Sequence, residues 1–395
     1  MSRRTFQSLV LLLFAGGLAA FFLVNPARWL TSHRATESLV VRLKATPDLD
    51  SWLDDARTQF LERTPHVSRR PVSLVIDYEG DAEATRSVVE SLTSDRAYDA
   101  WLVSRAITQL PDTARQLSLS TRTIIPLATT VLGVVMWEAR ASDILRGSGV
   151  VLPSSPPPTW GGLDVDWTAW HRALAPQDVG NPAGVPPLRW AIPHPLRSAS
   201  GLTALSLMSL GYLGPNQVQW PAKAGLEEGL LPWLTDFLRT VPRFRPSARE
   251  TASDFLNYGP SQTDVALLPE HLALEVMARA LERAGQGAVL LYPRVNVAYE
   301  YVFVDLKGSA THGPQREAIE AFHRFLRSEQ GQRLAFAHGL RAVLRDLQPR
   351  PDDPWARWEA GGARFALRLA WVDLQGVIEP TRQLAQRAME RLDRH

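Results

Sequence analysis

Strand-like apolar runs alternate with helical stripes along the chain, and short loops of Ser, Thr, Gly or Pro separate them. Residues 38–44 and 72–77 are rich in β-branched and aliphatic side chains, which predicts buried strands. Apolar residues recur at helical spacing over 49–60, and a third short strand is expected at 100–103. Strands that alternate with helices favour the α/β class, with parallel, doubly wound sheets.

Two stretches are expected to cross between two lobes. Residues 124–137 are extended and too long for one ordinary strand, and residues 293–297 separate two further expected strands. A helical tail is expected from about Phe365 to the end. The predicted organisation is a signal segment at 1–30, lobe 1 formed by 38–128 plus 294–395, and lobe 2 formed by 129–293.

The N-terminus is typical of an export signal. Residues 9–24 are uncharged and follow Arg3 and Arg4, so an apolar run lies behind a positive flank. As a helix the run spans about 24 Å, which is shorter than the ~30 Å hydrocarbon core, so a cleaved signal peptide and a short anchor both fit. Cleavage would expose Phe21 and Phe22 at a new terminus, which favours an uncleaved anchor. In both cases the body lies outside the cytoplasmic membrane, in the periplasm or at the cell surface.

Composition argues against several functions. The chain has 43 Lys and Arg against 41 Asp and Glu. This nearly balanced charge gives no reason to expect nucleic acid as the main partner. The chain has no cysteine, which excludes disulfides, thiolate nucleophiles and Cys-ligated metals. Its nine histidines form no metal-binding spacing, and neither a G-x-S-x-G elbow nor a P-loop lysine motif occurs. We therefore expect no catalytic residue, metal or cofactor, although a hydrolase triad assembled in space stays an open alternative.

Three loops between a strand and a helix are candidates for ligand binding. They contain Thr46, Gly80 and the run Ser198-Ala199-Ser200-Gly201. Helix N-termini offer free N–H groups and a positive dipole end, which suits an anion. The hydroxyls of Ser198 and Ser200 can add donors, and Gly201 permits a close backbone approach. The alternative is that these residues are ordinary helix N-caps.

Residues 38 to about 345 resemble type 2 periplasmic solute-binding proteins, in the branch that also accompanies von Willebrand A modules. The segments that carry this resemblance are 40–60, 99–104 (D-A-W-L-V-S), 194–202 (H-P-L-R-S-A-S-G-L) and 318–331. The run at 194–202 is the most specific of the four. No D-x-S-x-S loop occurs, so the chain itself contains no von Willebrand A module.

The resemblance implies two α/β lobes that are joined by two crossing strands and close over a ligand. The first loop reads Ala45-Thr46-Pro47 where relatives often have two small hydroxyl residues, so the anion site there is expected to be altered or lost. Tyr292 near the second crossing either contacts a ligand or packs in the hinge. The predicted ligand-binding residues are Thr46, Gly80, Ser104, Thr130, Ser198, Ser200, Gly201 and Tyr292.

The function implied is an extracytoplasmic solute-binding protein that captures a small ligand, anionic in one interpretation, for a membrane transporter. An ABC transporter permease or a protein with a von Willebrand A module is the expected partner, and residues 9–24 are expected to tether the chain to the membrane. The alternative is an envelope-anchored interaction or assembly module built on a degenerate binding fold.

Overall fold

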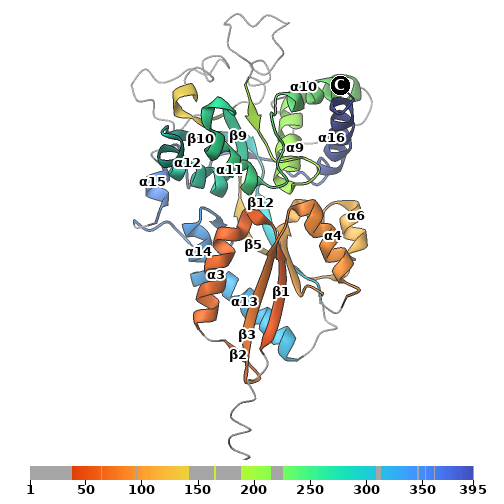
Figure 1. Cartoon of the computed structure of the whole chain (residues 1–395), viewed down its shortest axis with the longest axis vertical. Helices are drawn as coiled ribbons and strands as arrows, with labels where there is room; N and C mark the ends of the chain where they lie inside the picture. The colour runs from red at the N-terminus through yellow and green to blue at the C-terminus, as the bar shows by residue number, and fades with distance from the viewer. Residues whose placement is uncertain are drawn as a thin grey trace, which may run out of the picture.

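The computed structural model describes two helix-flanked sheets that lie one above the other along the long axis (Figure 1). This arrangement confirms the predicted two-lobed α/β fold. The predicted N-terminal helix and most of the proline-rich stretch lie outside the described residues. These are 38–394 except for 64, 95–96, 142–163, 166–187, 215–225, 308–312, 345–346, 352 and 360.

The sheet of lobe 1 is mixed. Strand β1 pairs in parallel with β3 and β4, whereas β12 runs antiparallel to both β4 and β5. The antiparallel pairs arise where the two crossing strands join the sheet. In sheet order the strands are β13 (Arg341–Ala342), β5 (Ile124–Thr130), β12 (Tyr299–Asp305), β4 (Ala100–Ser104), β1 (Leu39–Ala45), β3 (Arg70–Tyr78) and β2 (His66–Val67).

The sheet of lobe 2 is almost wholly buried. Every residue of its three long strands is buried, as expected when helices cover both faces of a sheet. The Trp137 indole stacks on the Phe255 ring with centroids 4.5 Å apart, which ties this sheet to a covering helix. The strands, in order, are β7 (Asp164–Val165), β10 (Ala288–Pro293), β6 (Leu132–Trp137), β9 (Val265–Pro269) and β8 (Trp190–Ala191).

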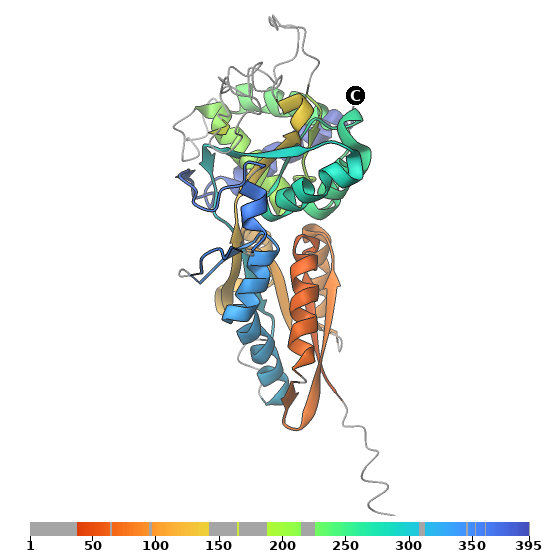
Figure 2. The same cartoon turned by 90° about the vertical axis from the view of Figure 1, so that its left-hand side faces the viewer.

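Helices cover both sheets (Figures 1 and 2). Those of lobe 1 are η1 (Pro47–Leu49), α3 (Asp50–Glu62), α4 (Asp81–Ser91), α5 (Arg105–Thr108), α6 (Pro111–Gln116), η2 (Leu119–Thr121), α13 (Pro314–Arg327) and α14 (Glu329–Ala337). Those of lobe 2 are α9 (Ala199–Leu213), α10 (Leu226–Arg239), α11 (Ala248–Tyr258), η3 (Gly259–Ser261) and α12 (Glu270–Ala284). Helix α9 is buried from Ala199 to Gly211, so it is a central helix that packs on all sides.

Both predicted crossings are confirmed. Strand β5 ends at Thr130 in the first sheet and β6 begins at Leu132 in the second. Strand β10 leads through β11 (Val295–Asn296) into β12. The buried Asn296 side chain joins the two crossings, because its amide donates to the Leu132 carbonyl at 2.8 Å and accepts from the Leu132 N–H at 3.1 Å. The two crossings are therefore held together at one level.

The C-terminal segment departs from the expectation of a helix from Phe365. Strand β14 (Ala370–Trp371) pairs with β11, and the Ala370 and Val372 N–H groups donate to the carbonyls of residues 294 and 296. Because residues 370 and 371 pair as a strand, they are not part of a helix. Helix α15 (Trp355–Glu359) precedes it, and α16 (Ile378–Leu392) follows.

Helix α16 packs on α9 and α10 and belongs to the core of lobe 2, although the sequence grouped it with lobe 1. Its apolar stripe fits a groove between those helices, and helical periodicity cannot reveal which lobe supplies the groove. The other predicted lobe boundaries stay a prediction.

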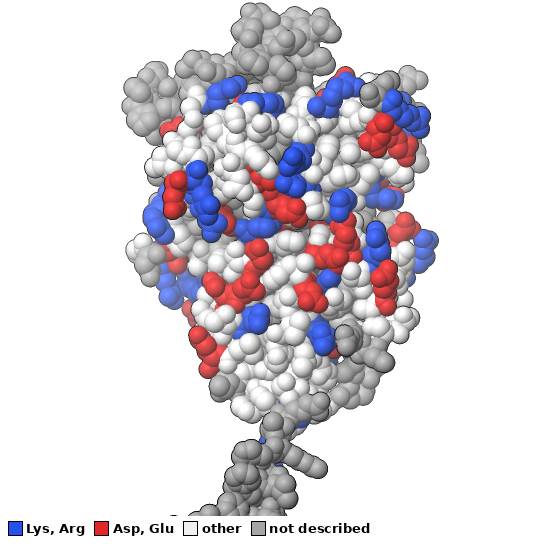
Figure 3. Space-filling view, in the orientation of Figure 1, with Lys and Arg blue, Asp and Glu red and all other residues white. Residues whose placement is uncertain are grey.

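Basic and acidic side chains are interspersed on the face in Figure 3. Within the described ranges, no helix has both the length and the apolar character needed to cross a bilayer. The apolar run at 9–24 lies outside those ranges.

Candidate functional site

The N-terminus of α9 is capped by a carboxylate from the other lobe. The Ala199 N–H donates to Asp81 Oδ2 at 2.7 Å, and Asp81 is the buried first residue of α4 in lobe 1. Ser198 occupies the N-cap position, but its hydroxyl makes no bond to the helix backbone and lies 2.8 Å from Ser200 Oγ. The interpretation of Ser198 as an ordinary side-chain cap is therefore wrong, and the capping acceptor is Asp81.

The N-terminus of α11 receives a second carboxylate from lobe 1. Asp48, in η1, accepts from the Arg249 N–H at 3.0 Å through Oδ1. Ser247 caps the same helix locally, because its hydroxyl accepts from the Glu250 N–H at 3.1 Å. His271 of α12 donates from Nε2 to the Asp48 carbonyl at 2.8 Å, since a carbonyl can only accept. Asp48 therefore holds two helices of lobe 2.

Further polar contacts join the lobes around these two carboxylates. The Ala82 N–H donates to the Arg197 carbonyl at 3.2 Å, and the Arg197 guanidinium pairs with Glu83 at 2.7 Å. Arg249 Nη2 donates to Ser51 Oγ at 2.9 Å and pairs with Asp50 at 2.5 Å. The two lobes thus meet through direct contacts between their own side chains.

Burial sets the protonation of this interface. Burial raises the pKa of Asp48 to about 6 and that of Asp81 to about 7, and in Asp81 repulsion from Asp48 adds to the rise. Burial lowers the pKa of His271 to about 3, so its ring is neutral at pH 7. Burial also raises the pKa of Tyr301 well above its usual value, which keeps the phenol neutral.

Several buried polar atoms of this cluster have no hydrogen-bond partner. They are Asp48 Oδ2, Asp81 Oδ1, His271 Nδ1 and Tyr301 Oη. Unmade hydrogen bonds in a buried site are costly, at about 1–3 kcal/mol each. Nevertheless, no three His, Asp or Glu side chains in the described part of the chain converge as metal ligands. The cluster is therefore an interface of buried polar groups, several of which have an unpartnered atom.

A cavity of about 430 Å³ opens beside this cluster, with walls from both lobes. Ser104 and Tyr299 line it from lobe 1, and Thr203 of α9 lines it from lobe 2. Thr203 is 1% exposed, and its hydroxyl has no hydrogen-bond partner. The half-exposed indole of Trp371 forms part of the wall. The cavity thus combines an aromatic surface with an unused buried hydroxyl.

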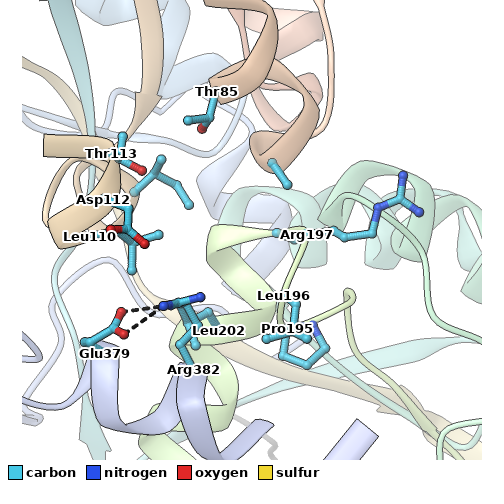
Figure 4. A pocket seen from close by; sticks show the side chains of 13 residues that line it. Thr85, Leu110, Asp112, Thr113, Pro195, Leu196, Arg197, Leu202, Glu379 and Arg382 are labelled. Atoms are coloured by element: carbon cyan, nitrogen blue, oxygen red, sulfur yellow. Dashed lines mark hydrogen bonds and ion pairs between the residues drawn. The ribbon is translucent and has the colours of Figure 1, made fainter. Parts of the chain in front are cut away.

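A second cavity of about 210 Å³ lies between α4, α6, α9 and α16 (Figure 4). Its lining is largely apolar, with Leu110 on one side and Leu202 on the other. Charged groups lie at its edge, where Arg382 pairs with Glu379 at 2.8 Å. Both cavities are therefore bounded by the two lobes together with the C-terminal segment.

Six of the eight predicted ligand-binding residues lie at or beside the interface between the lobes. Thr46 is buried beside Asp81, and a Cβ at Gly80 would lie 3.3 Å from the Pro246 carbonyl of lobe 2. Gly201 is required by packing, because a Cβ there would lie 2.3 Å from the Pro193 carbonyl. The others at this interface are Ser104, Ser198 and Ser200.

Thr130 and Tyr292 lie in the hinge. Thr130 is fully buried at the end of β5, next to the first crossing. The Tyr292 hydroxyl donates to Glu270 Oε1 at 2.5 Å, and Arg341 pairs with both oxygens of that carboxylate at 2.7 and 2.8 Å. This buried network joins β13 of lobe 1 to α12 of lobe 2. The placement of Tyr292 fits the hinge-packing alternative.

Sequence reasoning missed the residues that make the interface. Asp48 and Asp81 each lie within two residues of a predicted loop position, but an acidic residue in the first turn of a helix is ordinary, because the dipole favours it. Arg249 and His271 have no local pattern that marks them. Trp371 falls in the segment that was expected to be helical. Only the proximity of the Asp residues to Thr46 and Gly80 could have drawn attention to them.

One family model matches most of the chain. The model of the family described as bacterial extracellular solute-binding protein matches residues 41–341. Among curated proteins, none matches the chain. The segment after residue 341, which supplies Trp371, Glu379 and Arg382 to the two cavities, lies beyond the matched range.

Solved structures share the fold at low identity. The sulfate-binding protein SubI from Mycobacterium tuberculosis H37Rv is 18% identical with a TM-score of 0.54, over 87% of this chain and 99% of its own. The periplasmic binding protein AfuA from Actinobacillus pleuropneumoniae is 11% identical with a TM-score of 0.56, over 89% and 98%. Iron-bound HitA from Pseudomonas aeruginosa is 12% identical with a TM-score of 0.51, over 89% and 99%.

The raised pKa of Asp81 predicts the sign of a pH dependence. The folded protein binds this proton more tightly than the unfolded chain, so the associated stability is fully present below about pH 3.8 and is lost as pH rises through about 7. Asp81→Asn keeps a side-chain acceptor for the Ala199 N–H and removes the charge. We expect the wild type to lose stability relative to Asp81→Asn between about pH 4 and 7, by up to about 1.4 kcal/mol per pH unit.

Urea unfolding at a series of pH values measures this difference. Asp236→Asn, at a partly exposed site on α10, controls for the loss of one carboxylate. A difference that stays constant, or that grows in favour of the wild type with rising pH, would contradict the prediction.

Proposed function

The chain belongs to the family of bacterial extracellular solute-binding proteins, and we propose that it captures a small solute between its two lobes for delivery to a membrane transporter. The observation that carries this proposal is the 430 Å³ cavity, because its walls come from both lobes. A solute held there would contact lobe 1 and lobe 2 together. Its binding energy would then favour the closed arrangement of the lobes.

The volume and lining of the cavity suit a small polar solute with one apolar face. Ligand sites typically measure about 300–1,000 Å³ and combine apolar or aromatic walls with a few polar groups. Here Trp371 and Tyr299 supply aromatic surface, and Ser104, Thr203 and Gln109 supply hydroxyl and amide groups. The named relatives bind sulfate, fructose-6-phosphate or iron, so the fold alone does not select one solute.

The predicted site residues fall into distinct roles in this proposal. Ser104 contacts the solute, while Thr46, Gly80, Ser198, Ser200 and Gly201 shape the surface on which the lobes close. Thr130 and Tyr292 act in the hinge. The lobes keep their predicted boundaries, except that α16 moves to lobe 2.

The proposal also covers the localisation of the protein and its binding partners. The family is extracellular, and the apolar run at 9–24 behind two arginines supports a membrane tether. We further propose that an ABC transporter permease is a partner. The motifs at 99–104 and 194–202 support membership of the branch associated with von Willebrand A modules, and a protein with such a module is the second kind of partner that we propose.

Fractionation checks the tether, because the full chain should sediment with membranes, whereas a variant lacking residues 9–24 behind a cleavable signal should not. Equal release of both would contradict it.

A second candidate function follows from the capping carboxylates. Because Asp48 and Asp81 already join the lobes, the chain could serve as an envelope interaction or assembly module on a binding fold that no longer opens. A thermal-shift screen with small solutes separates the two candidate functions. A stable protein partner, together with no stabilising solute, would favour the module.

The unused hydroxyl of Thr203 gives a sharp test of the cavity. A solute that stabilises the wild type should add about 2.7 kcal/mol at a hundredfold excess over its Kd, so screening sugars, amino acids, polyamines and oxyanions by thermal shift identifies it. Thr203→Val preserves the shape of the side chain and removes a hydroxyl that has no partner in the protein. We expect unchanged or higher stability without solute and weaker solute binding, by about 0.5–1.5 kcal/mol.

Ser209→Ala is the matched control, because Ser209 Oγ is also buried on α9 without a partner but does not line the cavity. It should leave solute binding unchanged. Equal affinity of the wild type and Thr203→Val for the identified solute would remove this cavity from the site.

A further inference from the structure

We propose that Asp81 and Asp48 fill the oxyanion-binding positions at the N-termini of α9 and α11, so that the wild-type protein selects solutes that carry no oxyanion group. This inference rests on the proposed function and narrows the class of solute. Its consequence is that two carboxylates of lobe 1 act as internal ligands of lobe 2 whenever the lobes are in contact.

The contacts match those of a bound anion. Carboxylate oxygens lie 2.7 Å from the Ala199 nitrogen and 3.0 Å from the Arg249 nitrogen, the distances at which helix N-termini hold sulfate or phosphate oxygens. Helices α9 and α11 span 15 and 11 residues, so each has a developed dipole. Neither N–H group is available to an external anion while the carboxylates stay in place.

The parts of an anion site remain around Asp81. Ser198 and Ser200 are both at most 2% exposed and pair with each other at 2.8 Å beside the capped N–H group. The Asp81 Oδ1 atom is buried in the same place without a hydrogen-bond partner. An external oxyanion would have to accept from the Ala199 N–H group, which in this chain already donates to Asp81.

The local charge opposes an incoming anion. Asp48, Asp81, Asp50 and Glu83 gather near the two helix ends, where Arg197 pairs with Glu83 and Arg249 lies near Asp48 and Asp50. Arg249 is already committed to Asp50 and Glu275. A sulfate or phosphate ion would therefore meet net negative charge in a buried site, where repulsion is poorly screened.

Sulfate binding to carboxylate variants tests this inference. Calorimetric titration with sodium sulfate, against sodium chloride at equal ionic strength, compares the wild type with Asp81→Ala. The alanine variant frees the Ala199 N–H beside Ser198 and Ser200, so it should bind sulfate at least about tenfold more tightly than the wild type. Asp48→Ala provides the same test at α11, should Asp81→Ala fail to give a native circular dichroism spectrum.

Two controls separate the release of the N–H group from the loss of charge. Asp81→Asn keeps an acceptor for the Ala199 N–H and should not gain sulfate binding. Asp236→Ala removes a carboxylate far from the site, on the partly exposed part of α10, and should behave as the wild type does. Sulfate binding to the wild type as tight as to Asp81→Ala would overturn the inference, as would equal gains in Asp81→Ala and Asp236→Ala.

The sulfate experiment and the solute screen fail independently. A gain of sulfate binding by Asp81→Ala supports the inference even if the Thr203 test removes the 430 Å³ cavity from the site. Conversely, a wild type that binds sulfate with displacement of Asp81 overturns the inference and leaves solute capture intact.

Discussion

Two hydrogen bonds, each between a carboxylate of lobe 1 and a helix N-terminus of lobe 2, lie at the centre of the polar contacts that join the two halves of this protein. Asp81 caps α9 and Asp48 caps α11, and each bond spans from lobe 1 to lobe 2. Helix capping contributes roughly 0.5–2 kcal/mol, whereas burial of a carboxylate with one unpaired oxygen opposes it by a similar amount or more. The free energies that favour and oppose contact between the lobes are therefore similar in size, and binding of a solute or a proton can shift the equilibrium between them.

The hinge between the lobes explains how a small change in the contact energy can move one lobe relative to the other. Asn296 joins the two crossing strands, and the Glu270–Arg341 pair with Tyr292 fixes β13 of lobe 1 to α12 of lobe 2. These buried bonds define a pivot, while the carboxylate caps lie at the surface that opens or closes around it. The C-terminal segment adds Trp371 to the cavity and α16 to lobe 2, so it contributes to both the site and the frame.

Much of the fold follows from local sequence patterns, and much of the site does not. The strand at 265–269 is a continuous apolar run, and the strand at 39–45 is rich in aliphatic residues. The crossing at Val131 follows from a run too long for one strand. The partners of Asp48 and Asp81 depend on how two lobes face each other, which no local pattern encodes. The same holds for Gly201, whose close neighbour is a backbone carbonyl, and for Trp371, which a strand pairing places in the cavity wall.

The separation of the lobes in solution tests the role of the carboxylates most directly. The chain has no cysteine, so spin labels on cysteines introduced at the exposed Thr58 of α3 and Leu281 of α12 report a single distance across the interface. Double electron–electron resonance should give one narrow distribution in the wild type. With Asp48 and Asp81 both changed to alanine, we expect a longer and broader distribution, because the lobes lose both capping contacts. Identical distributions in the two proteins would show that the carboxylates do not hold the lobes together.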